Sequence, residues 1–285
     1  MRAKLKTKRI WFDTIGSSLA DDAERGERPT ILVLHGGPGI DHSPVRPTVT
    51  PLADLGQILL IDQCGHGRSD YGRPDDWTVE AWASDIAELC DVLEVTKPIL
   101  FGSSFGAMVA LAVAGMFPEL PSALVISNSG AGIIDHDATK EAFRRLGGDA
   151  VADIAWQSLE HPSPEASEAY HEACLPFYSH RPGAAEFARS MFASSIRTPE
   201  VGTHFQSTIK SLRPDRHAAT VVCPTLILVG SDDVMVPEPV AHILHGFFSP
   251  SVATLDLVPD AGHFLYRDNP EHAYRVLRSF IAQQA

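Results

Sequence analysis

Short aliphatic runs that alternate with helical patterns constrain the fold of this chain more than any other feature. Near-continuous apolar runs of four to seven residues are typical of strands that are covered on both faces, as in a parallel sheet. Their alternation with helices predicts βα units and therefore an α/β fold. The expected strands are residues 31–34, 57–62, 99–102, 123–127, 225–230 and 252–258.

Helical patterns occupy several of the gaps between these runs. Thr78 is the expected N-cap of a helix, because apolar residues follow it at helical spacing. A second helix is expected from about Ser104 to Phe117, and the last one from Pro270 towards Gln284.

The regular alternation stops after Gly130. From about residue 131 to residue 217 there is no convincing aliphatic strand, and helical patches take its place. Because a structureless loop of this length would be unusual, the segment predicts a helical lid inserted between two strands. We therefore expect a core formed by residues 1–130 and 218–285, with residues 131–217 as the lid. The helical patches are residues 139–146, 149–159, 166–174 and 184–192.

The composition is that of an ordinary globular protein. The chain has 285 residues, 44% of them hydrophobic, with a formal net charge of −13. This charge gives a nucleic acid or an anionic membrane nothing to bind, so neither is an expected partner. No run approaches the ~18 apolar residues of a membrane span, and the basic N-terminus lacks the apolar stretch of a signal peptide. Its lysines at positions 4, 6 and 8 alternate as in an edge strand. The four cysteines form no close pair, which predicts a reducing, cytoplasmic compartment.

A candidate nucleophile follows the strand expected at residues 99–102. The sequence Gly102-Ser103-Ser104-Phe105-Gly106 is a G-x-S-x-G motif placed between a strand and a helix. A tight strand-to-helix turn exposes the central serine, here Ser104, and small neighbours avoid clashes in that turn. The motif also occurs by chance, so this context carries much of the assignment.

A serine nucleophile needs a base and a carboxylate that orients the base, which can follow in the order Ser, Asp or Glu, His. The strand ending at Gly230 is followed by Asp232 and Asp233, where an orienting carboxylate is expected. We favour Asp233, because the spacing to Gly230 and Pro237 places it beyond the turn, and we interpret Asp232 as a turn residue.

His263 is the expected base, because it follows the last strand and Gly262 in the loop 259–264. The imidazole would take the Ser104 proton and return it to the leaving group. The chain has 13 histidines, so most are structural, and we interpret His35 and His66 in this way.

Acyl transfer also requires hydrogen-bond donors for the oxyanion. The backbone N–H of Phe105, directly after the nucleophile, is one expected donor. The other is expected in the loop His35-Gly36-Gly37-Pro38-Gly39, where glycine lets the backbone turn an N–H towards a substrate. We favour Gly37 over Gly36.

Taken together, these motifs resemble the proline iminopeptidase (prolyl aminopeptidase) branch of the α/β-hydrolases. Residues 35–39 are similar to its HGGPG motif, residues 62–69 (DQCGHGRS) to its DQ-x-G-x-G-R-S loop, and residues 102–106 to its nucleophile elbow. The resemblance implies the α/β-hydrolase fold, a mostly parallel central sheet flanked by helices with an inserted helical lid. It implies the same triad and the same oxyanion donors. Cys64 stands where many members have Arg, and Phe105 where prolyl-specific members commonly have Trp.

The sequence therefore predicts a serine hydrolase that cleaves a small ester or amide through an acyl-enzyme on Ser104. The branch includes carboxylesterases and lactonases as well as aminopeptidases, so an ester, a lactone or a short peptide remains possible as substrate. An acyltransferase with the same triad and a non-catalytic receptor on the same fold are the alternatives from other classes.

An aminopeptidase needs a carboxylate for the free ammonium of its substrate, and the lid offers several candidates. The lid aromatics are expected to contribute either an apolar pocket wall or lid core. The candidate glutamates are Glu160, Glu165, Glu168, Glu172, Glu186 and Glu200. The aromatics are Phe143, Trp156, Phe177, Tyr178, Phe187 and Phe192.

No cofactor or metal is expected, because none of the common nucleotide or zinc motifs occurs. Asp41-His42 and the segment 135–137 (DHD) could suggest a metal site. They lack a third metal ligand at a sensible spacing, and we interpret them as polar loop residues. Cys64 is not the nucleophile, because Ser104 takes that position.

Overall fold

Within residues 1–16 and 28–284, which the computed structural model describes, one eight-stranded sheet has the order β1-β2-β4-β3-β5-β6-β7-β8. From β4 to β8 every neighbouring pair is parallel, whereas β1 and β2 are antiparallel to their neighbours. The strands are β1 Arg2–Lys4, β2 Arg9–Ile15, β3 Thr30–Leu34, β4 Gln57–Asp62, β5 Ile99–Ser103, β6 Ala123–Ser127, β7 Thr225–Gly230 and β8 Ala253–Val258.

The six aliphatic runs form the six parallel strands, which confirms the predicted α/β fold. Side chains alternate between the two faces along each strand. Leu32 and Leu34 of β3 enter one hydrophobic cluster, and Ile31 and Val33 enter a second. Both faces are apolar because both are covered by helices, and this explains why the runs show no polar alternation.

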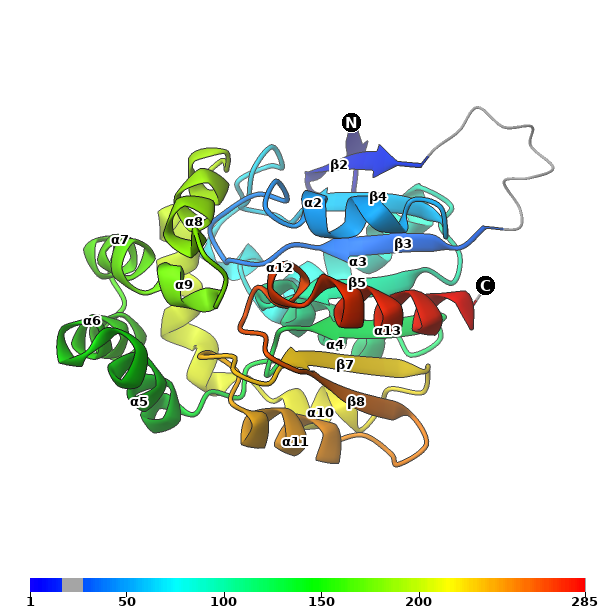
Figure 1. Cartoon of the computed structure of the whole chain (residues 1–285). Coiled ribbons are helices and arrows are strands. Elements are labelled where there is room, and N and C mark those ends of the chain that lie inside the picture. The colour runs from blue at the N-terminus through cyan, green and yellow to red at the C-terminus, as the bar shows by residue number, and fades with distance from the viewer. Residues whose placement is uncertain (17–27, 285) are drawn as a thin grey trace.

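The helices form a layer on each face of the sheet (Figure 1). The first cluster includes side chains of α3 Val79–Val92, α4 Phe105–Met116 and α11 Glu238–Gly246. The second includes side chains of α2 Arg46–Val49 and α13 Pro270–Ala282. Thr78 caps α3 as expected, with its Oγ1 accepting a hydrogen bond from the Ala81 amide.

The N-terminal residues lie at one edge of the sheet. Strand β1 pairs with β2, which in turn pairs with β4. Lys4 ends β1, and Lys6 and Lys8 lie in the turn between the two strands. The alternating lysines therefore mark a short edge hairpin rather than one continuous strand. Residues 17–27 of the expected first core segment, and residue 285, lie outside the described part of the chain.

Six α-helices occur between β6 and β7, and most of them lie beyond one end of the sheet, on the left in Figure 1. The four helical patches of the sequence correspond to the first four of these helices. The next two, α9 and α10, have no counterpart among those patches, and α10 packs against α4 of the core. The six are α5 His136–Gly147, α6 Asp149–Glu160, α7 Pro164–Ala173, α8 Ala184–Ala193, α9 Pro199–Thr208 and α10 Pro214–Ala218.

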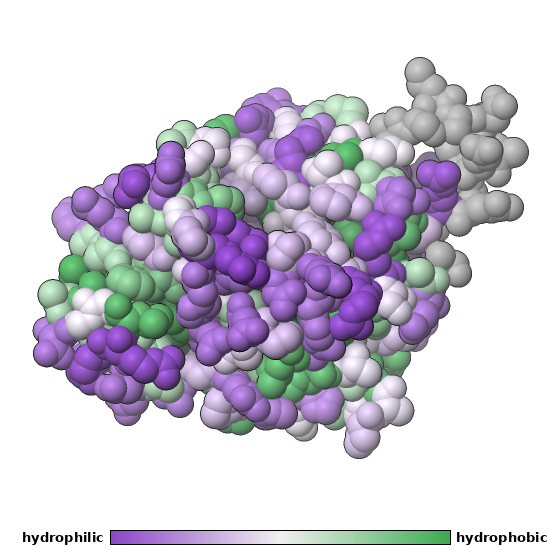
Figure 2. Space-filling model, in the orientation of Figure 1, coloured by the Kyte–Doolittle hydropathy of each residue, from purple (hydrophilic) through white to green (hydrophobic). Residues whose placement is uncertain are grey.

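The inserted helices have a small apolar core of their own, in which Phe143 and Cys174 are fully buried. Figure 2 shows apolar side chains gathered over the lid end of the molecule, on the left, whereas the surface over the rest of this face is mainly hydrophilic. Among residues 1–16 and 28–284, no helix is long and apolar enough to cross a lipid bilayer.

Candidate active site

Ser104 lies in a tight turn between β5 and α4, with a φ angle of +51° that non-glycine residues rarely adopt. The glycines on either side permit this turn. A Cβ atom on Gly102 would lie 2.4 Å from Cα of Ala107, and one on Gly106 would lie 2.1 Å from the carbonyl oxygen of Leu34. The G-x-S-x-G pattern is therefore a requirement of backbone packing, and it leaves the Ser104 side chain half-exposed above the sheet.

The three residues predicted as a triad lie together at the carboxyl ends of the strands. Nε2 of His263 is 3.1 Å from Oγ of Ser104. Nδ1 of His263 is 2.8 Å from Oδ2 of Asp233. The side chains of both His263 and Asp233 are buried, so this carboxylate contacts the ring with little competition from water. Because a carboxylate only accepts hydrogen bonds, Nδ1 carries the proton and Nε2 is free to accept one.

The two neighbouring aspartates have different surroundings. Oδ1 of Asp233 accepts hydrogen bonds from the amides of Met235, at 2.8 Å, and Val236, at 3.0 Å. These bonds fix the carboxylate so that it faces His263. Asp232 is exposed and its Oδ2 accepts a hydrogen bond from Oγ of Ser231. The structure thus places Asp233, and not Asp232, against His263.

Asn128 also contacts the base, and the sequence analysis missed it. Its Nδ2 lies 3.3 Å from Nε2 of His263, and its Oδ1 accepts a hydrogen bond from Oγ of Ser103 at 3.3 Å. Asn128 directly follows β6 and has a φ of +45°. An asparagine at a strand end is a weak signal by itself. Its importance follows from the pairing of β6 with β5, which brings it beside the serine turn.

Asp268, which the sequence analysis also missed, connects the inserted segment to the loop that contains His263. The Asp268 carboxylate is completely buried and accepts hydrogen bonds from the amides of His180, at 3.2 Å, and Gly262, at 2.9 Å. It also accepts one from Oγ of Ser179. Because Gly262 precedes His263, this carboxylate holds the lid segment and the loop of the base in one arrangement.

The expected oxyanion donors lie at the same cavity as Ser104. Gly37 has a φ of +125°, which favours glycine. Phe105 is the first residue of α4, so its N–H has no partner within the helix. Within the described residues, no hydrogen bond engages the backbone N–H of Gly37 or Phe105. Both groups are therefore available to a ligand.

Two histidines support the region behind this loop. His35 and His66 are buried, and their ring centroids are 5.1 Å apart. Burial lowers the pKa of His66 to about 3, with a smaller contribution from His35, and burial also lowers the pKa of His35. Both rings are therefore neutral at pH 7, in keeping with the structural role expected for them.

A cavity of about 270 Å³ opens above Ser104, between the sheet and the lid. Its lining is mainly apolar, and no aspartate or glutamate occurs among the described residues that line it. Tyr178, Phe187 and Phe192 contribute to its wall, whereas Phe143, Trp156 and Phe177 do not. Phe143 and Phe177 instead belong to the apolar core of the inserted helices, and Trp156 packs against His136.

The six lid glutamates do not line this cavity. Two of them pair with cationic side chains of the inserted segment. Glu160 accepts a hydrogen bond from Nζ of Lys210 at 2.8 Å and also contacts His136. Glu168 forms an ion pair with Arg197. A carboxylate that receives a substrate ammonium is therefore not present in the described wall.

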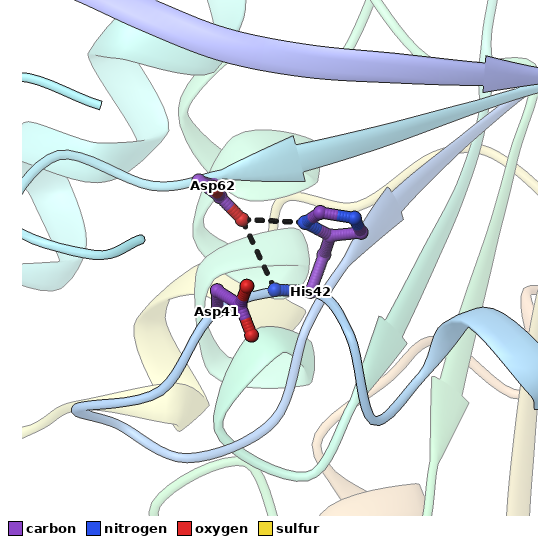
Figure 3. A group of neighbouring side chains, drawn as sticks. All are labelled: Asp41, His42 and Asp62. Carbon is purple, nitrogen blue, oxygen red and sulfur yellow. Dashed lines mark hydrogen bonds and ion pairs between the residues drawn. The ribbon is translucent and has the colours of Figure 1, made fainter. Parts of the chain in front are cut away.

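Asp41, His42 and Asp62 form the one group of potential metal ligands found among residues 1–16 and 28–284 (Figure 3). The sequence analysis expected no further ligand for Asp41-His42, but Asp62, at the end of β4, provides one. The three ligand atoms lie within 4.8 Å of one another. Asp62 was missed as a third potential ligand because it comes from a neighbouring strand rather than from the same loop.

The atoms of this group already have hydrogen-bond partners. Oδ1 of Asp62 accepts from Nδ1 of His42 at 2.7 Å, and its Oδ2 accepts from the Arg68 amide at 2.9 Å. Oδ2 of Asp41 accepts from the guanidinium of Arg68 at 3.1 Å and from Oγ of Ser43 at 2.9 Å. A cation would have to displace these donors. The group is therefore better described as a hydrogen-bonded connection between two loops than as a metal centre.

Two further groups near the site titrate outside their ordinary ranges. Burial would raise the pKa of the Asp62 carboxyl, but the hydrogen bond from His42 and other neighbouring donors hold it below its ordinary value. Asp62 is therefore charged at pH 7. Burial raises the pKa of the Cys64 thiol to about 12, which makes this cysteine an inert thiol rather than a nucleophile.

Known proteins that are similar to this chain identify its family. The family model described as alpha/beta hydrolase fold matches residues 29–270. A proline iminopeptidase from Saccharolobus solfataricus is 28% identical over 286 residues, covering 91% of this chain and 86% of the relative. A 2-hydroxy-6-oxo-2,4-heptadienoate hydrolase from Pseudomonas putida is 28% identical over 264 residues, covering 90% of each chain. The structure of a thermophilic esterase from Thermogutta terrifontis superposes with a TM-score of 0.72 at 23% identity, covering 100% of this chain and 98% of that chain.

The family model spans most of the chain, and the mostly parallel sheet with helices on both faces is in keeping with this family. The similarity to proline iminopeptidases that the motifs indicated is also present over nearly the whole chain. This protein therefore belongs to the alpha/beta hydrolase fold family and is an enzyme of that family.

Proposed function

We propose that the protein is a serine hydrolase that works through an acyl-enzyme on Ser104. His263 removes the proton from Oγ of Ser104 as the oxygen attacks the substrate carbonyl carbon. Asp233 holds the Nδ1–H tautomer of His263 and stabilises the imidazolium that forms. The backbone amides of Gly37 and Phe105 donate hydrogen bonds to the oxyanion. The 3.1 Å contact between His263 and Ser104 supports this assignment most directly.

The second half of the reaction uses the same groups. The imidazolium of His263 gives its proton to the leaving oxygen, and the bond between the carbonyl carbon and that oxygen breaks. A water molecule then loses a proton to His263 and attacks the ester formed on Ser104. Collapse of this second oxyanion releases the acid, and the proton returns to Oγ of Ser104.

We further propose that the substrates are esters or lactones rather than peptides with a free amino terminus. The observation that carries this choice is the lack of any aspartate or glutamate among the described residues that line the cavity. A substrate ammonium in a mainly apolar cavity would lose its hydration without gaining a carboxylate partner, which is costly. A neutral acyl group has no such requirement.

A substrate panel tests this choice. We expect wild-type protein to hydrolyse short p-nitrophenyl esters and small lactones, and to leave Pro-, Ala- and Phe-arylamides with a free amine essentially uncleaved. N-blocked arylamides serve as the control for amide reactivity itself. Cleavage of the free-amine arylamides, but not of their N-blocked forms, would overturn the ester proposal in favour of an aminopeptidase.

A further inference from the structure

His171 places a polar ring in an otherwise apolar part of the cavity wall. The residue lies on α7 and lines the cavity together with Phe192 and Leu175. Its ring packs on the Phe192 ring, with the centroids 4.4 Å apart. His171 is half-buried and lines the cavity, so the chemistry of its ring nitrogens affects what this wall can bind.

Arg197 fixes the protonation of this ring. Its guanidinium is held by the carboxylate of Glu168 and lies over the Phe192 ring, 5.8 Å from the centroid. The backbone of Arg197 forms a β-bridge with Ile40, which further limits its position. From there its Nη2 lies 3.4 Å from Nδ1 of His171. A guanidinium has no acceptor, so Nδ1 must accept and the proton of the neutral ring lies on Nε2.

The ring of His171 stays neutral at ordinary pH. Burial lowers its pKa to about 4, and the positive charge of Arg197 contributes to the lowering. Within the described residues, no hydrogen bond engages Nε2. The wall therefore presents a neutral N–H donor that lacks a protein acceptor.

A second cavity histidine has the opposite arrangement. Nδ1 of His136 contacts the Glu160 carboxylate, which also accepts a hydrogen bond from Lys210. A carboxylate only accepts, so Nδ1 of His136 is the donor in this contact, whereas Nδ1 of His171 is an acceptor. His136 and His171 are two of the three histidines that line the cavity, and neighbours of opposite charge hold their Nδ1 atoms.

We propose that Nε2–H of His171 donates a hydrogen bond to a second oxygen of the substrate, remote from the ester that Ser104 attacks. This inference rests on the proposed ester hydrolysis and narrows its substrates to esters with a ketone or ether oxygen on one of their chains. A site built to bond such an oxygen discriminates against an analogue that lacks it, because the half-buried donor, once covered by the bound analogue, has no partner.

Matched substrate pairs test the proposal. Each pair contains an ester with a ketone at one chain position and the alkyl ester of the same length. One series varies the ketone along the acyl chain of p-nitrophenyl esters, and a second varies it along the alcohol chain of butyrate esters, followed by pH-stat titration. We expect kcat/KM of wild-type protein to favour the ketone ester by about tenfold at one position in one series.

Two variants separate the hydrogen bond from the shape of the ring. His171→Gln keeps an N–H donor near the Nε2 position and is expected to retain the preference. His171→Leu removes the donor, and we expect the kcat/KM of the ketone ester to become nearly equal to that of the matched alkyl ester. His136→Leu is the matched control, since it removes a different histidine of the cavity wall, and it is expected to leave the ratio of the two kcat/KM values within about twofold of wild type.

Three results would overturn the proposal. The first is a wild-type protein that prefers no ketone ester at any position in either series. The second is a preference that persists in His171→Leu. The third is a wild-type protein that hydrolyses none of the esters in either series, which would overturn the ester function and this inference with it. The first two results leave ester hydrolysis standing, so the two failures are distinguishable.

Discussion

Nε2 of His263 lies 3.1 Å from Oγ of Ser104, although the two residues are 159 positions apart in the sequence. The contact exists because both residues follow strands of the parallel part of the sheet, whose carboxyl ends meet at one edge. Asp233 follows a third such strand and holds the far side of the same ring. The fold thus brings together three short loops, and the inserted helices close the cavity above them.

Asparagine substitutions distinguish the two neighbouring aspartates. We expect Asp233→Asn to lower kcat for a p-nitrophenyl ester by roughly 10⁴-fold, because the amide no longer holds the required tautomer of His263. Asp232→Asn is the matched control. Its exposed carboxylate contacts Ser231 and not the base, so we expect kcat within about twofold of wild type. A larger loss for Asp232→Asn than for Asp233→Asn would contradict the triad described above.

Alanine substitutions test the packing of the serine turn. We expect Gly106→Ala to lower the free energy of unfolding by about 1–3 kcal/mol, because the new Cβ would meet the carbonyl oxygens of Leu34 and His35. Gly246→Ala is the control, since a Cβ there meets nothing within 4 Å. Gly246 ends α11, so we expect that free energy to be unchanged or raised by up to about 1 kcal/mol. Urea unfolding of both variants is the measurement, and equal effects would mean that the turn is not closely packed.

The buried, neutral His66 predicts a loss of stability in acid. Its pKa is lowered to about 3 in the folded protein, whereas an unfolded histidine titrates near 6.5. Between these values the unfolded chain binds the additional proton, so the stability supplied by the neutral ring falls as the pH drops below about 6.5. From pH 7 to pH 4.5, we expect wild type to lose about 2.5 kcal/mol relative to His66→Asn.

Urea unfolding at several pH values measures this difference. Asparagine keeps a donor close to Nδ1 of His66, which contacts the carbonyl oxygen of Cys64, but it does not titrate. The exposed His242, replaced in the same way, is the control for the exchange of a histidine for asparagine. A constant difference for His66→Asn would show that the ring is not held neutral by burial.

Local patterns predicted the parts of the site that depend on backbone geometry. The glycines around Ser104 and the position of Asp233 beyond Gly230 follow from the turns that these loops must make, so residue type and spacing revealed them. The six parallel strands were equally visible, because a strand covered on both faces needs an unbroken apolar run.

Features that depend on which strands are neighbours were not visible in the sequence. Asn128 contacts His263 only because β6 lies beside β5, and Asp62 joins Asp41 only because β4 lies beside β3. Helix α9, Pro199–Thr208, was missed because its glycine and threonines give a weak helical pattern. The lack of acidic residues in the cavity wall likewise depends on how the lid glutamates pair, which composition does not reveal.

Labelling with a fluorophosphonate probe tests the central claim most directly, because the probe forms a covalent bond only with an activated serine. Intact-mass and peptide mass spectrometry of the wild-type protein should find one adduct, on the peptide that contains Ser104, and none on Ser104→Ala. Ser103→Ala is the matched control for the neighbouring hydroxyl and should still be labelled at Ser104. An adduct that persists in Ser104→Ala at the wild-type rate would contradict the assignment of Ser104 as the nucleophile.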